Sequence, residues 1–113
     1  MDDCIFCKIV RGEIPTTIVA ENEHAIAFDD IAPVTPVHTL VVPRLHIASM
    51  SEATADDEQM LAACLLLARD VAVIKEIRET GWRVGTNTGP DAGQSVFHLH
   101  FHVMGGTRLS LGG

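Results

Sequence analysis

The segment Phe97-His98-Leu99-His100-Phe101-His102-Val103 constrains the fold more than any other part of the sequence. Successive side chains of a β-strand point to opposite faces, so this alternation places three histidines on one face and apolar side chains on the other. Packing does not explain three titratable rings on one face, because apolar or hydroxyl side chains would pack as well. We therefore predict a strand over 96–104 with one buried face and one reactive face.

Two kinds of chemistry use such a face. Neutral imidazoles two residues apart can ligate one metal ion, or one imidazole can act as a nucleophile while its neighbour orients it or moves protons. The preceding loop, 87–95, contains Gly93, which allows close approach of the backbone to a ligand. Gln94 and Ser95 follow it and supply hydrogen-bond donors beside the histidines. This loop is therefore a candidate cradle for a phosphate group.

The rest of the chain predicts short strands around one long helix. Thr54 and Asp57 resemble a capping box, acidic residues fill the first turn and Gly81 follows the last one, which predicts a helix over 54–80. The segment 4–10 is compatible with a brief helix or a metal-bound turn. Further strands, of which the first two form a hairpin and the third is central, are predicted over 17–20, 25–28, 39–42 and 82–86. This order indicates an α+β fold around an antiparallel sheet.

The long helix is apolar on more than one side. One stripe at helical spacing contains Met60, Cys64, Leu67, Val71 and Ile74, and apolar residues outside it include Leu61, Leu65 and Leu66. A helix that is apolar nearly all round is normally buried on more than one side. In a small domain this pattern predicts a homodimer packed through the helix, with Cys64 in the core.

Size and charge exclude several classes of protein. A chain of 113 residues supports one core, so 1–113 is expected to be one domain. Fifteen acidic and eight basic side chains give a net charge of −7, which would repel a nucleic-acid polymer. The longest apolar run, 60–68, is far shorter than the roughly 20 residues that cross a bilayer. No secretory signal is recognised and the number of cysteines is odd, so we expect a cytoplasmic protein with reduced thiols or metal ligands.

Cys4 and Cys7 have the spacing of a zinc knuckle or of a redox pair. No second local pair of cysteines completes a zinc finger, and no βαβ pattern surrounds the pair as in a thioredoxin-like protein. Spacing alone leaves both interpretations open.

Taken together, these motifs resemble the histidine triad (HIT) family, and in particular its nucleotide-binding branch, which hydrolyses nucleoside phosphoramidates and related adenylated compounds. The resemblance covers most of the chain. It rests on the segments 4–9, Phe28-Asp29-Asp30-Ile31-Ala32-Pro33, Pro36-Val37-His38-Thr39-Leu40-Val41-Val42-Pro43, Asn87, Gly93-Gln94-Ser95-Val96 and His98-Leu99-His100-Phe101-His102-Val103-Met104.

The resemblance implies a five-stranded antiparallel sheet with one long helix and a short N-terminal helix, paired into a homodimer with a continuous sheet. It implies that His100 attacks the α-phosphorus of a purine nucleotide and forms a covalent nucleotidyl-histidine. The other catalytic residues would be His102, Ser95 and His38. The substrate would be bound by Asp30 at the ribose, Ile31 beside the base, Asn87, Gly93 and Gln94 at the phosphate, and Ser95, His100 and His102.

The resemblance also implies a structural zinc held by Cys4, Cys7, His46 and His98, and no organic cofactor. Three alternatives remain at this point. The chain could be a dinucleoside polyphosphate hydrolase or phosphorylase of the same family, or a metallohydrolase whose histidine triad holds a catalytic zinc. It could also be a nucleotide-binding interaction protein with little turnover.

Overall fold

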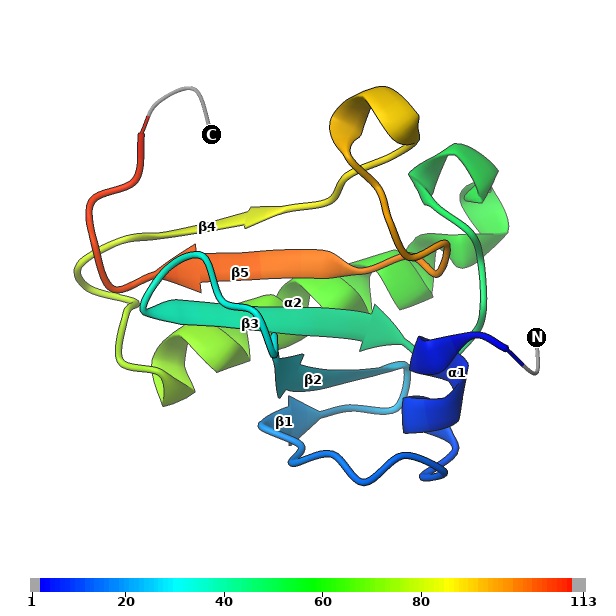
Figure 1. Cartoon of the computed structure of the whole chain (residues 1–113), viewed down its shortest axis with the longest axis horizontal. Coiled ribbons are helices and arrows are strands. Elements are labelled where there is room, and N and C mark those ends of the chain that lie inside the picture. The colour runs from blue at the N-terminus through cyan, green and yellow to red at the C-terminus, as the bar shows by residue number, and fades with distance from the viewer. Residues whose placement is uncertain (1–2, 111–113) are drawn as a thin grey trace.

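The computed structural model describes residues 3–110 and contains one antiparallel sheet with the strand order β1-β2-β3-β5-β4 (Figure 1). The strands are β1 (Ala20–Glu21), β2 (Ala25–Asp29), β3 (Val37–Pro43), β4 (Trp82–Gly85) and β5 (Phe101–Gly105). The helices are α1 (Ile5–Val10) and α2 (Glu58–Ile74), with short 3-10 turns at Met50–Glu52, Ala55–Asp57 and Pro90–Ala92. The prediction of an α+β fold with five antiparallel strands, one long helix and a short N-terminal helix is confirmed.

The two faces of the sheet have different partners. Alternate residues of the central strands, such as Val41 and Val103, pack against α2 in the main core. The residues between them face the other way, where Phe28, Leu40 and Phe6 of α1 form a second apolar cluster. The long helix accordingly lies behind the sheet in Figure 1 and the short helix lies in front of it. The face that carries α1 is the one on which the polar residues of the site collect.

The last strand is shorter than predicted. Its pairing with β3 begins at Phe101, so the prediction of a strand over 96–104 is wrong for 96–100. In that segment the Leu99 N–H donates to the Ile47 carbonyl at 2.7 Å, so the turn that follows β3 takes the place of a neighbouring strand. The alternation nevertheless holds in space, because Leu99, Phe101 and Val103 all lie in the main core.

The long helix begins as the sequence predicts and ends earlier. The capping box of Thr54 and Asp57 is present, and a 3-10 turn leads from it into α2. The helix stops at Ile74 because Glu76 adopts a left-handed conformation with φ +60°, and the Ile77 N–H donates back to the Ala72 carbonyl. No local sequence pattern predicts a helix end there, because Glu is rare in that conformation. None of the helices in residues 3–110 has the length and apolar character needed to cross a membrane.

The predicted apolar stripe of the long helix is buried at its first four positions and is not buried at the fifth. Met60, Cys64, Leu67 and Val71 are buried, whereas Ile74 is half exposed. Burial raises the pKa of the Cys64 thiol to about 12, so this cysteine is a neutral core residue, as predicted.

The first hairpin is also shorter than predicted, since 17–19 do not form part of β1. Only the Val19 N–H reaches the sheet, where it donates to the Ala27 carbonyl at 2.8 Å. The residues just before it, 14–17, instead line the cavity described below.

Candidate functional site

His100 sits where the chain enters β5, and its hydrogen bond fixes the position of its proton. Its Nδ1 lies 2.8 Å from the His98 carbonyl oxygen. A carbonyl only accepts, so Nδ1 carries the hydrogen and a neutral His100 has a bare lone pair on Nε2. The residue is 8% exposed and lines a cavity of about 610 Å³. The geometry therefore presents an oriented nitrogen nucleophile.

Two further histidines lie beside it on the same face of the sheet. The His100 and His102 ring centroids are 5.0 Å apart, and His102 Nδ1 lies 2.8 Å from His38 Nε2 on β3. Burial, reinforced by the neighbouring charges of His100 and His38, lowers the pKa of His102 to about 4. His102 is therefore neutral at physiological pH and able to donate one hydrogen bond and accept another.

The cavity beside these histidines has an apolar interior and a polar wall. Phe6, Phe28 and Leu40 contribute apolar surface, and Asp30 and Ser95 lie in the lining with His100 and His102. Its volume lies in the range of pockets that hold small ligands. The cavity is therefore suited to a ligand that has a flat apolar part and a charged or polar part.

Several residues expected to bind a substrate lie at this cavity. Asp30 lines it, and its Oδ1 accepts a hydrogen bond from the Ala32 N–H at 2.9 Å. Ile31 also lines it and is 99% exposed, so its whole side chain is available for contact. Ser95 lines the cavity from the loop that precedes β5.

The other three residues of that loop that are expected to bind phosphate, Asn87, Gly93 and Gln94, lie outside the cavity lining. The Gln94 amide donates to the Ala48 and Val96 carbonyls and accepts from the Gly89 N–H, so it is used to hold the loop together. Gly93 has φ +79°, a conformation that favours glycine. Asn87 is exposed. Contact of these three residues with a phosphate stays a prediction.

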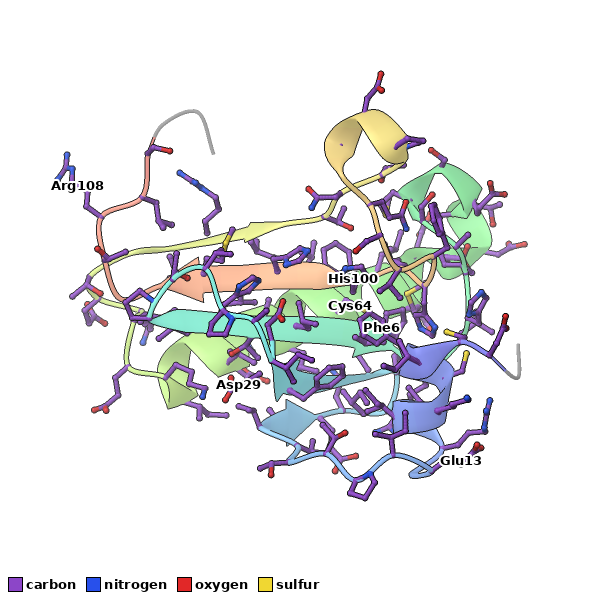
Figure 2. The ribbon with its side chains drawn as sticks, viewed as in Figure 1. Phe6, Glu13, Asp29, Cys64, His100 and Arg108 are labelled. Carbon is purple, nitrogen blue, oxygen red and sulfur yellow. The ribbon has the colours of Figure 1, made fainter. Side chains whose placement is uncertain are left out.

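Sequence reasoning missed the role of Phe6. Its ring packs edge-on against His100, with centroids 5.0 Å apart, and against His98 at 5.9 Å. Figure 2 shows Phe6 and His100 close together on the α1 side of the sheet. The sequence signal for this contact is the position of Phe6 between Cys4 and Cys7. A metal ion bound to both cysteines and to His98 would bring Phe6 close to the histidines.

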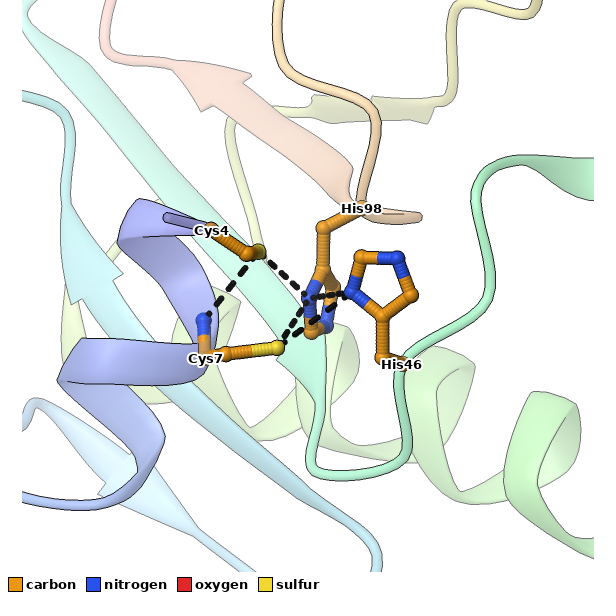
Figure 3. A group of neighbouring side chains, drawn as sticks. All are labelled: Cys4, Cys7, His46 and His98. Carbon is orange, nitrogen blue, oxygen red and sulfur yellow. Dashed lines mark hydrogen bonds between the residues drawn. The ribbon is translucent and has the colours of Figure 1, made fainter. Parts of the chain in front are cut away.

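A second cluster combines two cysteines and two histidines from three distant segments (Figure 3). His98 Nδ1 lies 3.4 Å from Cys4 Sγ, 3.5 Å from Cys7 Sγ and 3.1 Å from His46 Nδ1. Cys7 Sγ lies 3.3 Å from His46 Nδ1. A tetrahedral zinc ion separates its ligands by about 3.3 Å for two nitrogens and about 3.6 Å for nitrogen and sulfur. The four side chains therefore fit zinc.

The hydrogen bonds of His98 also prepare it as a ligand. Its Nε2 lies 2.9 Å from the Pro43 carbonyl oxygen, so Nε2 carries the hydrogen and Nδ1 presents a bare lone pair to the cysteines. Burial lowers the pKa of His98, which favours the neutral form that binds metals. Burial likewise raises the pKa of Cys7, a cost that a bound cation would offset. The three alternating histidines thus belong to two different clusters. His98 belongs to the candidate metal site formed with Cys4, Cys7 and His46, which we call the metal group. His100 and His102 line the cavity.

Comparisons with known proteins show which family the chain belongs to. Residues 11–109 match the model of the HIT domain. A HIT-like protein of Synechococcus elongatus is 46% identical over 96% of this chain and 95% of its own length. The structure of a HIT family hydrolase from Clostridium thermocellum has a TM-score of 0.94 and 44% identity, covering 97% of this chain and 96% of its own. A histidine triad nucleotide-binding protein from Candida albicans has a TM-score of 0.81 and 32% identity, covering 89% of this chain and 73% of its own. The chain therefore belongs to the HIT family and resembles its hydrolases.

Proposed function

We propose that this protein hydrolyses purine nucleoside phosphoramidates, and related adenylated compounds, through a covalent intermediate on His100. The observation that carries the proposal is the hydrogen bond from His100 Nδ1 to the His98 carbonyl, 2.8 Å long, which leaves Nε2 free as a nucleophile. The relation to HIT hydrolases supports the reaction class.

The reaction would proceed in two displacements. In the first, His100 Nε2 forms a bond to the α-phosphorus while the bond from phosphorus to the amine nitrogen breaks, and the departing amine takes up a proton. In the second, water attacks the phosphorus and gives up one proton, which balances the proton taken up by the amine. The bond to His100 breaks, which releases a nucleoside monophosphate and restores the neutral ring. His102 and Ser95 would contact the phosphate and the leaving group, which is supported by their position in the cavity lining with His100.

The cavity provides matching surfaces for the other parts of a nucleotide. The apolar walls formed by Phe6, Phe28 and Leu40 suit a purine ring, with Ile31 covering it from the exposed side. The Asp30 carboxylate suits the two ribose hydroxyls. Asn87, Gly93 and Gln94 would bind the phosphate oxygens through the loop beside the histidines.

The decisive experiment measures turnover of a fluorogenic adenosine phosphoramidate by the wild type and by His100→Ala, with zinc content determined on both proteins. We expect an active wild type, an inactive variant and about one zinc per chain in each. If the variant lost its zinc together with its activity, His100 would be a metal ligand and the protein a metallohydrolase. Faster turnover of a diadenosine polyphosphate would identify the dinucleoside polyphosphate hydrolase instead. Binding of nucleotide without turnover would indicate an interaction protein.

We further propose that Cys4, Cys7, His46 and His98 hold a structural zinc ion. The separations among their ligand atoms, none above 4.8 Å, support this. When bound, zinc would supply a crosslink between α1, the turn after β3 and the entry to β5. Thiolate ligands need a reducing compartment, which fits a cytoplasmic protein. Cys7→Ser should lower the zinc content well below one per chain, whereas Cys64→Ser should leave it unchanged.

The protein is also proposed to form a homodimer with a continuous sheet. Leu65, Leu66, Val73 and Ile74 of α2 are each about half exposed, and β4 is an edge strand with one free side. Sedimentation of the wild type should give twice the chain mass. Leu66→Glu should shift it toward the monomer, and Leu45→Glu, at an equally exposed position outside α2, should not. A wild type that sediments as a monomer would refute the proposal.

A further inference from the structure

We infer that Cys4 and Cys7 are a site of reversible oxidation, at which a disulfide excludes the metal ion and loosens α1 from the wall of the cavity. The disulfide rests on the placement of the two thiols alone. The release of zinc rests on the zinc site proposed above, and the effect on turnover rests on the proposed function.

The two cysteines lie within reach of a disulfide. Cys4 is the N-cap of α1 and Cys7 lies three residues further along the same turn. Helical residues with this spacing have Cα atoms about 5 Å apart, inside the range of roughly 4.4–6.8 Å that disulfides bridge. The two Sγ atoms lie within 4.8 Å of each other. A disulfide therefore requires rotation of the two side chains and little movement of the backbone.

The two thiols differ in their access to solvent. Cys4 is partly exposed, whereas Cys7 is buried. The Cys7 N–H donates to Cys4 Sγ at 3.3 Å, which holds that sulfur beside the second cysteine. Cysteines that respond to oxidants are typically accessible and lie next to a second thiol that resolves the first product. Cys4 therefore reacts first and Cys7 resolves it.

With a peroxide as the oxidant, the reaction has two steps. The Cys4 thiolate attacks one peroxide oxygen, so that a sulfur–oxygen bond forms, the oxygen–oxygen bond breaks and hydroxide leaves. The Cys7 thiolate then attacks the sulfur of this sulfenic acid, the sulfur–sulfur bond forms and a second hydroxide leaves. Each hydroxide takes up a proton from solvent. Two electrons have then passed from the pair of sulfurs to hydrogen peroxide, which is reduced to two water molecules.

The disulfide and the metal ion compete for the same atoms. Cys7 Sγ lies 3.3 Å from His46 Nδ1 and 3.5 Å from His98 Nδ1 in the metal group. Zinc binds the thiolate form of cysteine, whereas a sulfur atom in a disulfide carries no negative charge. Oxidation thus removes two of the four ligands and leaves only the two histidines. Cys4 and Cys7 would therefore be metal ligands in the reduced protein and a redox pair in the oxidised one.

Phe6 connects this pair of cysteines to the cavity. It lies between them in α1, lines the cavity and packs edge-on against His100 with ring centroids 5.0 Å apart. A metal ion would join α1 to the turn after β3 and to the entry of β5, whereas the disulfide joins α1 only to itself. So short a helix is not stable without such a crosslink. Oxidation should therefore loosen the contact between Phe6 and His100.

Titration of the zinc-loaded protein with hydrogen peroxide tests the oxidation without any substrate. A chromogenic chelator measures the zinc released, and mass spectrometry of the peptide that contains both cysteines measures the loss of two hydrogens. We expect one disulfide for each zinc released, and recovery of both thiols and zinc binding after dithiothreitol and zinc are added. Zinc that stays bound while the disulfide forms would overturn the inference. So would zinc release with Cys4 converted to a sulfinic acid and no disulfide.

Three serine variants separate the roles of the cysteines. Cys7→Ser keeps the first thiol and removes the second, so a dione probe that traps sulfenic acids should label Cys4. Cys4→Ser leaves the buried thiol, which we expect to be labelled about tenfold more slowly. Cys64→Ser is the matched control and should release zinc as the wild type does, because Cys64 is buried in α2. Equal labelling of Cys4 and Cys7 would refute the order of the two steps.

Hydrogen exchange and kinetics test the consequence at the cavity. In the oxidised protein we expect faster amide exchange in α1 than in α2, and kcat/KM for an adenosine phosphoramidate lower by about tenfold or more. Reduction and zinc should restore both. In Phe6→Leu, which already lacks the aromatic contact, oxidation should lower kcat/KM by only about threefold or less. The same loss in Phe6→Leu as in the wild type would refute the role of Phe6.

The outcomes keep the separate proposals apart. A reduced protein that turns over no phosphoramidate would refute the proposed function, and a purified protein without zinc would refute the zinc site. In either case the peptide masses still decide whether Cys4 and Cys7 form a disulfide. A pair that stays reduced at peroxide concentrations that oxidise the thiol of a short control peptide would overturn the inference.

Discussion

The hydrogen bond of one ring nitrogen determines which nitrogen of His98 and of His100 is free to bind a ligand. His98 and His100 both donate to main-chain carbonyls, at 2.9 and 2.8 Å, through opposite nitrogens. The free nitrogen is consequently Nδ1 in His98 and Nε2 in His100, so two residues of the same type are suited to different tasks. A movement of the backbone that separated either ring from its carbonyl would therefore change which nitrogen is free.

The low pKa of His102 predicts a loss of stability in acid. Its pKa of about 4 in the folded protein lies below the ordinary value of 6.5, so the folded state binds fewer protons between these values. Stability then falls as the pH drops from 6.5 to about 4 and levels off below. Thermal unfolding should show that the wild type loses on the order of 2 kcal/mol more over this range than His102→Gln, after allowance for solvent screening. Parallel pH profiles for the two proteins would contradict this.

Much of the site at this scale follows from the sequence. The alternation of histidine with apolar residues anticipates the separation of the reactive ring of His100 from the buried Leu99 and Phe101. The direction of the His98 proton and the partner of His102 do not follow from it, because the Pro43 carbonyl lies 55 residues from His98 and His38 lies 64 residues from His102. Such pairings are products of the tertiary fold.

At the scale of elements, the boundaries depend on contacts that a local pattern does not contain. The segment 96–100 alternates as a strand does, yet it bonds to the turn after Pro43. The long helix is predicted to end before Gly81 and ends instead at Ile74, two residues before the left-handed Glu76. The capping box of Thr54 and Asp57 is a local signal, and the structure contains it as predicted.

The ends of two strands provide a matched pair of glycine substitutions, at Gly105 of β5 and at Gly85 of β4. A Cβ on Gly105 would lie 2.8 Å from Ile77 Cδ1 and 3.3 Å from the Gly81 carbonyl oxygen, whereas one on Gly85 of β4 would meet nothing within 4 Å. Gly105→Ala should lower the free energy of unfolding by roughly 1–3 kcal/mol because the turn after α2 must move. Gly85→Ala should change it by no more than about 0.5 kcal/mol. Chemical denaturation measures both, and equal effects would show that the turn yields freely.

At the scale of the whole molecule, one face of the sheet forms the main core and the other face forms the candidate site. One face packs on α2, and the other face carries the cavity, α1 and the metal group. The sequence predicts this division through its strands and its single long helix. It does not predict that α1 contributes to both the metal group and the cavity, because that requires Cys4, Phe6 and Cys7 to meet the start of β5.

Removal of metal should therefore affect the molecule beyond the four ligands. A helix as short as Ile5–Val10 is not stable by itself. Chelation of zinc from the purified protein should lower Tm by roughly 10 °C and should speed amide hydrogen exchange in α1 more than in α2. Cys7→Ser should already have the lower Tm and should not respond to the chelator. An unchanged Tm after complete removal of zinc would contradict a structural role.

The proposed nucleophile, His100, is oriented by the backbone of its own chain, since its ring donates to the carbonyl of His98. No substitution of a single side chain deletes that carbonyl, whereas the walls of the cavity consist of replaceable side chains such as Ile5, Ile9 and Ile31. Point mutations therefore affect the cavity walls and the orienting carbonyl differently. They can change which ligand the cavity fits while the carbonyl that orients His100 stays in place, which favours diversification of substrates over a change of reaction.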